Sequence, residues 1–252
     1  MNQTIKHCFV VTSAINSKFG VYTPAARLQQ TLTTIDSIRA RAPGSKIVIM
    51  ECTGTPLTEA QSQLLEENCD LLVDFSTDAD VRAIYDSTDN WDIVKNSTEI
   101  MCFGKTLRMC LDDGDFTGVD RIHKMSGRYI LNDEFDLGVY EEHPDRVIIG
   151  PKNRSQFPIE VTGIELQYMA RLWSWPANQT ERVIQTYTDS LNYMAQRVAA
   201  GGYADIEHVL YKFLPTELVT EIPVLGVEGS IAPNGVATVS YTHLTLPTKR
   251  IV

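Results

Sequence analysis

The chain has 252 residues, of which 43% are hydrophobic, and its formal net charge is −10. This length and apolar content are enough for one sizeable core, and the acidic balance argues against a sequence-independent nucleic-acid-binding surface. No apolar run reaches the roughly 18 residues of a membrane span, and the N-terminus lacks a signal-peptide pattern. The five cysteines form no Cys-x-x-Cys pair, so we expect a protein of the reducing cytoplasm without a zinc or redox motif.

The first 75 residues alternate between strand-length apolar runs and helical patterns. The apolar runs occupy residues 7–15, 46–51 and 71–75. Between them, Thr23 and Pro24 are typical of the N-cap and first residue of a helix, and Thr58 with Gln61 matches a capping box. Continuous apolar runs suit strands that are buried on both faces. The alternation therefore predicts a Rossmann-like α/β fold with a mostly parallel central sheet flanked by helices.

The rest of the chain continues this α/β pattern. Residues 76–90 are polar and predict a loop with one short helix. We expect strands at residues 121–125, 147–150 and 166–175, and helices at residues 93–111, 183–198 and 206–213. The glycine-rich stretch at residues 225–235, "LGVEGSIAPNG", predicts a loop after a short strand. No linker divides the chain, so we interpret residues 1–238 as one domain.

The last residues, 239–252, read "VSYTHLTLPTKRIV". This string resembles translated sequencing-adapter read-through, and we interpret it as a non-native tail that is left out of the fold. The alternative interpretation is a β-branched edge strand followed by a basic tail.

The common nucleotide and hydrolase motifs are absent from the sequence. There is no Gly-x-Gly-x-x-Gly after the first strand, no Walker A pattern, no His-Glu-x-x-His and no Gly-x-Ser-x-Gly. In an open parallel sheet, ligands bind outside the carboxyl ends of the strands. That rule selects as candidate ligand-binding residues Thr12, Ser13, Ala14, Glu51, Lys124, Ser126, Gly127, Arg128 and Tyr129.

These residue types indicate an anionic ligand such as a nucleotide diphosphate. Arg128 can pair with a diphosphate in bidentate fashion, and Lys124 adds a point charge. Gly127 lets the backbone approach a ligand closely, while Glu51 can accept hydrogen bonds from a base or a ribose. Each residue also has a purely structural interpretation, such as the end of a strand or a turn with a surface ion pair.

The chain resembles the nucleotide-diphospho-sugar transferases, which are glycosyltransferases of GT-A fold. The stretches that carry the resemblance are "FVVTSAI", "RLQQTLTTIDSIRARAPGSKIVIME", "HKMSGRYILNDEF", "IEHVLYKFLP" and "LGVEGSIAPNG". They reach from about residue 7 to residue 235. The likeness is greatest to members from bacterial polysaccharide clusters and from phage or marine viral genomes. None of these stretches is a diagnostic catalytic motif.

The resemblance implies that Thr12, Ser13 and Glu51 hold the donor nucleotide, since they match the end of the first strand and the acidic residue after the second. The family's metal-binding Asp-x-Asp follows the central strand, and here that place is taken by residues 126–128. Metal dependence is therefore in doubt, with Arg128 and Lys124 as replacement cations and Asp133 as the alternative ligand for Mn²⁺ or Mg²⁺. The Asn132-Asp133-Glu134 stretch also fits a helix N-cap with an acidic first turn.

The resemblance further implies a base near the start of a late helix in inverting members of the family. Asp205 and Glu207 occupy that position, with His208 beside them. A first-turn carboxylate that is favoured by the helix dipole is the structural alternative for Glu207.

Two functional hypotheses follow from the resemblance, and a third remains beside them. The first is a transferase that moves a sugar from a nucleotide-diphosphate donor to a glycan, lipid-linked or other hydroxyl acceptor. The second is a domain of the same fold that binds a nucleotide or glycan without turnover. The third is another nucleotide-binding enzyme, such as a nucleotidyltransferase. That enzyme would need a carboxylate pair for Mg²⁺ and an early glycine-rich loop.

Overall fold

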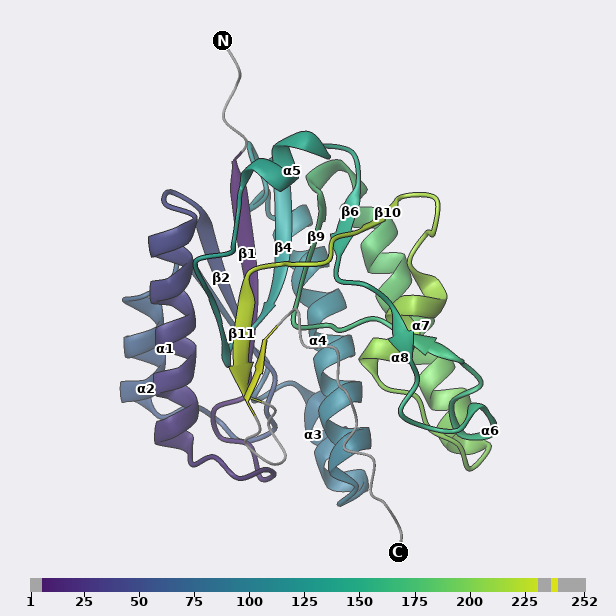
Figure 1. The fold of residues 1–252 in the computed structure, drawn as a ribbon. Helices are drawn as coiled ribbons and strands as arrows, with labels where there is room; N and C mark the ends of the chain where they lie inside the picture. Colours follow the sequence, from purple (N-terminus) through teal and green to yellow (C-terminus); the bar gives the residue numbers. More distant parts are fainter. Residues whose placement is uncertain (1–5, 231–236, 240–252) are drawn as a thin grey trace, which may run out of the picture.

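A computed structural model describes residues 6–230 and 237–239, and its centre is a seven-stranded sheet (Figure 1). The strands run in the order β10-β6-β9-β4-β1-β2-β3, and only β9 is antiparallel to its neighbours. Their bounds are β1 (His7–Ser13), β2 (Lys46–Glu51), β3 (Leu71–Asp74), β4 (Arg121–Ser126), β6 (Val147–Ile149), β9 (Leu172–Pro176) and β10 (Val219–Glu221). The expected α/β class with a mostly parallel sheet is confirmed.

The two small sheets are built from short strands. One has the order β12-β11-β5, with β5 (Tyr129–Leu131), β11 (Val227–Ser230) and β12 (Ala237–Val239). The other pairs β7 (Asn153–Arg154) with β8 (Leu166–Gln167). Residues 225–230 therefore include strand β11, where a loop was expected. Of the stretch interpreted as a tail, residues 240–252 lie outside the described residues.

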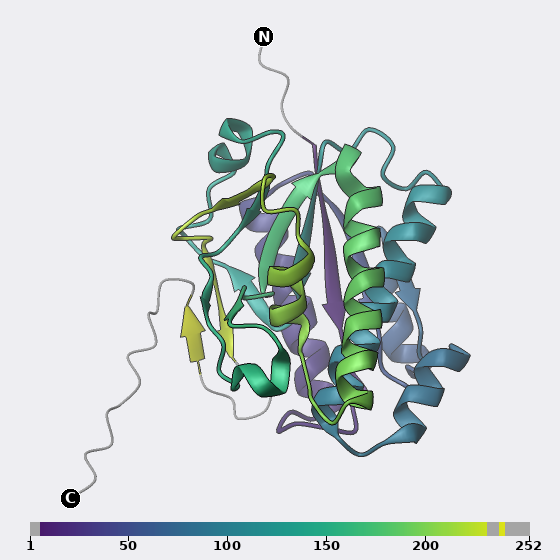
Figure 2. The same ribbon diagram turned by 90° about the vertical axis from the view of Figure 1, so that its right-hand side faces the viewer.

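Helices cover both faces of the large sheet. They are α1 (Pro24–Arg41), α2 (Glu59–Glu66), α3 (Ala79–Ser87), α4 (Trp91–Asp112), α5 (Gly138–Glu142), α6 (Ile159–Thr162), α7 (Thr180–Ala199) and α8 (Ile206–Phe213), with a 3₁₀ turn at Ala177–Gln179. Figure 1 shows α1 and α2 on one side of the sheet and α4 and α7 on the other, and Figure 2 shows α7 lying along the sheet beside α4. No helix of the described residues is long and apolar enough to cross a bilayer.

The alternation of side chains along β1 explains this layering. Successive residues of a strand point to opposite faces of the sheet. Phe9 and Val11 pack with α1 and α2 in one core cluster, while Cys8 and Val10 pack with α4 and α7 in the other. Every residue of β1 is buried, which is why its centre, residues 8–11, is continuously apolar rather than alternating.

The helix signals in the sequence are confirmed as hydrogen bonds. The Thr23 side chain accepts from the backbone N–H of Ala26 at the start of α1. Thr58 and Gln61 form the reciprocal capping box that opens α2. These bonds satisfy backbone donors that would otherwise have no intrahelical partner.

The expectation of one strand at residues 166–175 is wrong. The stretch divides into β8, which pairs with β7, and β9, which pairs with β4 and β6. Aromatic and β-branched content marks strand-forming residues, but it does not show that the chain leaves one sheet for another. The break falls at residues 168–171.

Two glycines with positive φ allow a prediction about folding. Gly226 (φ 66°) precedes β11, and an added Cβ would lie 2.1 Å from the Phe135 nitrogen; Gly44 has φ 80°, and no described atom lies within 4 Å of its Cβ position. We expect Gly44→Ala to cost about 1–2 kcal/mol from backbone strain alone. Gly226→Ala should cost about 2–5 kcal/mol, because the overpacking penalty is added to the strain. The measurement is the free energy of unfolding in urea. Equal losses of this free energy in Gly44→Ala and Gly226→Ala would contradict the interpretation that Gly226 has no room for a side chain beside Phe135.

Candidate functional site

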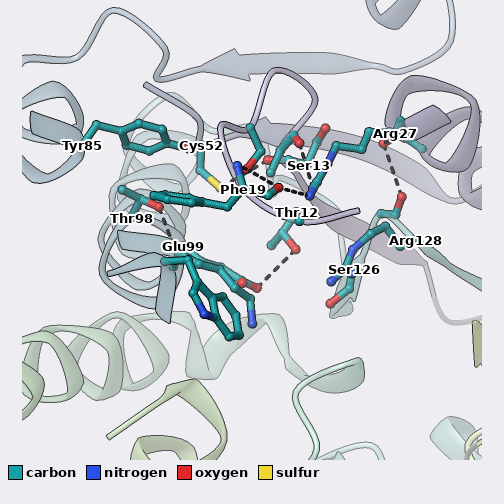
Figure 3. Close-up of a pocket in the computed structure, with 17 residues that line it drawn as sticks. Thr12, Ser13, Phe19, Arg27, Cys52, Tyr85, Thr98, Glu99, Ser126 and Arg128 are labelled. Atoms are coloured by element: carbon teal, nitrogen blue, oxygen red, sulfur yellow. Dashed lines mark hydrogen bonds between the residues drawn. The ribbon is translucent and has the colours of Figure 1, made fainter. Parts of the chain in front are cut away.

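A pocket of about 240 Å³ opens at the carboxyl ends of β1 and β4. Its wall is formed by the end of β1, the following loop, the first turns of α1, helices α3 and α4, and the turn between β4 and β5. Figure 3 shows this arrangement, with Phe19 and Tyr85 on one side of Thr12, and Arg128 and Ser126 on the other. Six of the nine candidate ligand-binding residues line it, namely Thr12, Ser13, Ala14, Ser126, Gly127 and Arg128.

Three cationic side chains and one carboxylate line the pocket. The cations are Arg27, Lys95 and Arg128, and the carboxylate is Glu99. Arg27, Lys95 and Glu99 were not among the residues expected from the sequence. Arg27 stands one turn into α1, while Lys95 and Glu99 are four residues apart on α4. The rule that ligands bind at the carboxyl ends of strands does not select these three residues, because they lie on helices.

Arg27 is nearly buried, at 7% exposure. Its Nη1 donates to the carbonyl of Ala14 at 3.1 Å and its Nη2 to the carbonyl of Phe19 at 2.8 Å. Burial and the nearby charge of Arg128 lower the pKa of Arg27 below its ordinary value. The guanidinium group therefore holds the loop after β1 in place and faces a second positive charge across the pocket.

Glu99 is neutralised by Lys124. The Lys124 Nζ lies 2.9 Å from the Glu99 Oε1 and also donates to the Ser126 hydroxyl and the Ala170 carbonyl, each at 2.8 Å. Burial alone would raise the pKa of Glu99, but Lys124 overcomes this effect and lowers the pKa to about 2. The Thr12 hydroxyl donates to the same carboxylate at 3.3 Å.

Lys124 and Glu51 are placed differently from the sequence expectation. Lys124 is 1% exposed, its three N–H groups already have partners, and it does not line the pocket. Glu51 is fully buried and accepts hydrogen bonds from the Ser13 hydroxyl at 2.8 Å and from the backbone N–H of Ile15 and Thr53, each at 3.1 Å. Burial raises the pKa of Glu51. Its carboxylate therefore fastens the ends of β1 and β2 together and is not directed at a ligand.

Gly127 and Tyr129 also have structural explanations. An added Cβ at Gly127 would lie 2.8 Å from the Thr12 carbonyl oxygen, so the close approach is between β4 and β1. Tyr129 is buried in the core, and the guanidinium of Arg171 lies 5.3 Å from its ring centroid. Neither observation requires a ligand. Gly127 does bring the backbone of Arg128 to the pocket wall.

Three aromatic rings line the pocket and were not predicted. They belong to Phe19, Tyr85 and Trp91. Tyr85 packs over Gly54, where an added Cβ would lie 2.6 Å from the ring. Trp91 is 39% exposed at the start of α4. Flat apolar rings opposite cationic groups suit a ligand that has both an aromatic and an anionic part.

Asp205 and Glu207 lie at the start of α8, as expected, but neither lines the pocket. The Asp205 side chain caps the helix and bonds Nδ1 of His208, whose Nε2 lies 2.7 Å from the Ser155 hydroxyl. Glu207 is half-buried. Burial, with the charge of Asp205, raises the pKa of Glu207 to about 7, and the charges of Lys95 and Glu99 also act on it. The carboxylate is thus coupled electrostatically to the pocket wall.

Asp133, the weaker metal candidate, lies on the surface. Its side chain is 89% exposed and forms an ion pair with Arg41 at the end of α1. It does not line the pocket. Within the described residues, no group of three or more His, Cys, Asp or Glu side chains gathers in a way that could hold a metal ion.

Similar solved structures are known for this chain at low sequence identity. No protein-family model matches the chain, and no curated protein matches it. One similar solved structure is the Mn/GDP form of core-mannan synthase A (CmsA/Ktr4) from Aspergillus fumigatus, with a TM-score of 0.49 and 7% identity over 94% of this chain and 81% of that one. Another is the galactosyltransferase LgtC in complex with donor and acceptor sugar analogues, with a TM-score of 0.47 and 12% identity over 82% of this chain and 70% of that one.

Proposed function

We propose that the protein binds a nucleotide-diphosphate sugar in this pocket and transfers the sugar to a hydroxyl group of a glycan or lipid-linked acceptor. The observation that carries the proposal is the charge of the pocket. Three cations and one already neutralised carboxylate line it, although the whole chain has a net charge of −10. Such a local excess of positive charge favours an anionic ligand.

The pocket offers separate surfaces to the two ends of such a donor. The proposed place of the nucleobase is against the rings of Phe19 and Tyr85, and that of the diphosphate is on the cationic side of the pocket, where Arg128 lies. The hydroxyl of Thr12 and the backbone of Ala14, at the end of β1, are proposed to bind the nucleoside. This arrangement agrees with the general position of ligands at the carboxyl ends of strands in open α/β sheets.

Glu207 is our candidate for the base that accepts the proton of the acceptor hydroxyl. Its pKa of about 7 suits a group that must take up a proton near neutral pH. Asp205 is a positioning residue, because its charge raises the pKa of Glu207 and its side chain caps the helix. In a direct displacement, the acceptor oxygen forms a bond to the anomeric carbon as the bond to the diphosphate breaks. The cations of the pocket stabilise the departing diphosphate.

We propose that the protein acts in the cytoplasm and contributes to polysaccharide synthesis. The five cysteines are free thiols, which agrees with a reducing compartment. The ring of Trp91, exposed at the edge of the pocket, is the proposed contact for the acceptor. The absence of a basic stripe in the sequence still argues against a nucleic-acid partner.

The test is a donor panel of UDP-, GDP-, CMP- and dTDP-linked sugars, read by thermal shift and by release of free nucleotide. We expect at least one diphosphate donor to raise the melting temperature and to be slowly hydrolysed or transferred. For a site at 100 times its Kd, the stabilisation is about 2.7 kcal/mol. A folded protein that no donor stabilises would contradict the proposal.

Nucleotide binding without turnover is the second candidate, and the same panel separates it from the first. Glu99 on the pocket wall is paired with the buried Lys124, and residues 126–128 stand where the resemblance implies a metal-binding Asp-x-Asp. A donor that stabilises the protein but releases no nucleotide, with any acceptor tried, would favour this candidate.

A further inference from the structure

We propose that a pair of guanidinium groups, Arg27 and Arg128, holds the diphosphate and neutralises it without a divalent cation; this rests on the proposed donor binding. The sequence indicates Arg128 and Lys124 as replacement cations, but the structure pairs Lys124 with Glu99. Arg27 is the second binding residue in its place, and the two arginines have the role that a metal ion would otherwise have.

Each of the two guanidinium groups has a buried N–H group without a hydrogen-bond partner. The Nε of Arg27 and the Nη1 of Arg128 are buried without a hydrogen-bond partner, and within the described part of the chain neither arginine forms an ion pair. A buried donor without an acceptor costs roughly 1–3 kcal/mol, and more when the group is charged. Both unpartnered atoms belong to residues that line one pocket.

The two positive charges also act on each other. The charge of Arg128 contributes to the lowered pKa of Arg27, so the two groups are close enough to repel. An oxygen-rich anion between them would supply acceptors to both guanidinium groups and remove the repulsion. A diphosphate fits this requirement because each guanidinium group can bond two of its oxygens at once.

The side chain of Arg27 and the backbone of Arg128 are held in place before a ligand arrives. Arg27 is fixed by the carbonyls of Ala14 and Phe19. Arg128 follows Gly127 in a tight turn, where its backbone N–H donates to the Ser126 carbonyl at 2.8 Å and the Gly127 N–H donates to Thr12. A donor group that is already ordered loses less conformational entropy on binding.

The carboxylates near the pocket do not fit a metal ion. Mg²⁺ and Mn²⁺ take carboxylate, carbonyl and water oxygens as ligands. Glu99 already has the ammonium group of Lys124 at 2.9 Å, and Glu51 accepts bonds from Ser13, Ile15 and Thr53. An ammonium group therefore occupies the position beside Glu99 that a metal ion would need.

Calorimetric titration with UDP, GDP and dTDP tests the inference, in excess EDTA and in MnCl₂. We expect at least one diphosphate to bind with the same affinity in both solutions. Arg128→Ala should lower the affinity for that diphosphate by about 10- to 100-fold. The affinity for the corresponding uncharged nucleoside should stay unchanged. Arg128→Lys should recover only part of the loss, because an ammonium group lacks the planar fork.

Two controls keep the result interpretable. Arg182→Ala removes an arginine whose side chain is 58% exposed on α7, and it should leave affinity unchanged. Arg27→Lys keeps the charge and tests the second arginine, with a melting curve to show that the loop after β1 is still folded. A loss of affinity in folded Arg27→Lys, confined to diphosphates, supports the pair.

The possible failures are distinguishable. Binding of a diphosphate only with MnCl₂ would overturn the inference and leave the proposed donor binding standing. Equal losses for nucleoside and diphosphate in Arg128→Ala would also overturn it, since the arginine would then support the pocket as a whole. No binding of any nucleoside diphosphate in either solution would overturn the proposed function itself.

Discussion

Replacing Glu207 by glutamine is expected to lower sugar transfer by about 10²- to 10⁴-fold, the usual contribution of a general base. Donor affinity should stay unchanged, because Glu207 does not line the pocket in which we place the donor. The measurement is a comparison of kcat and donor Kd in the two proteins. Glu217→Gln, an exposed carboxylate on the surface, is the matched control and should retain full activity.

The pKa of Glu207 also predicts the direction in which activity changes with pH. A base must be ionised to accept a proton, and burial with the charge of Asp205 raises the pKa of Glu207 to about 7. Activity should therefore rise as the pH increases through about 7 and level off above it. Asp205→Asn removes the neighbouring charge and should lower the pKa of Glu207, moving this rise to lower pH. Asparagine also caps helices well, so the fold should persist.

Two outcomes would contradict the assignment of Glu207. Full activity in Glu207→Gln would exclude it as the base. An unchanged pH profile of activity in Asp205→Asn would show that a group other than Glu207 causes the rise of activity with pH.

Replacing Lys124 by methionine is expected to destabilise the protein by about 3–5 kcal/mol, because the variant leaves the Glu99 carboxylate buried without its partner. For a chain of this size the loss corresponds to a fall in melting temperature of roughly 6–20 °C. Removing both charges, as in Lys124→Met with Glu99→Gln, should recover much of the loss. The measurement is the free energy of unfolding in urea for the wild type, both single variants and the double variant.

The pH dependence of the pair also has a definite direction. In the folded protein the pKa of Glu99 is about 2, below its ordinary value of 4.5. Its stabilising effect is therefore present above about pH 4.5 and is lost as the pH falls through about 2. The difference in stability between the wild type and Lys124→Met should shrink over this window. A difference that stays constant from pH 5 to pH 2 would show that the ion pair is not its source.

The sequence predicted part of the candidate site, and the errors in that prediction have a common cause. The rule that ligands lie at the carboxyl ends of parallel strands selected Thr12, Ser126 and Arg128, which line the pocket. The same rule selected Glu51 and Lys124, whose charged groups have partners inside the protein. Position at a strand end is a local property, whereas the partner of a charge depends on contacts between distant residues. Lys124 and Glu99 are 25 positions apart in the sequence.

By itself, the sequence determined the class of fold and the order of the elements from β1 to β4 in this protein. Apolar runs, caps and helical periodicity are local signals, and they were sufficient for the strands β1, β2 and β4 and for the helices between them. Only the tertiary structure decided which charges are neutralised and which remain available. Burial removes water from a carboxylate or a guanidinium group, so its chemistry is then set by the few atoms that reach it. Arg27 is the clearest example, because nothing in the pattern of α1 distinguishes it until the helix packs on the sheet and Arg128 lies near it.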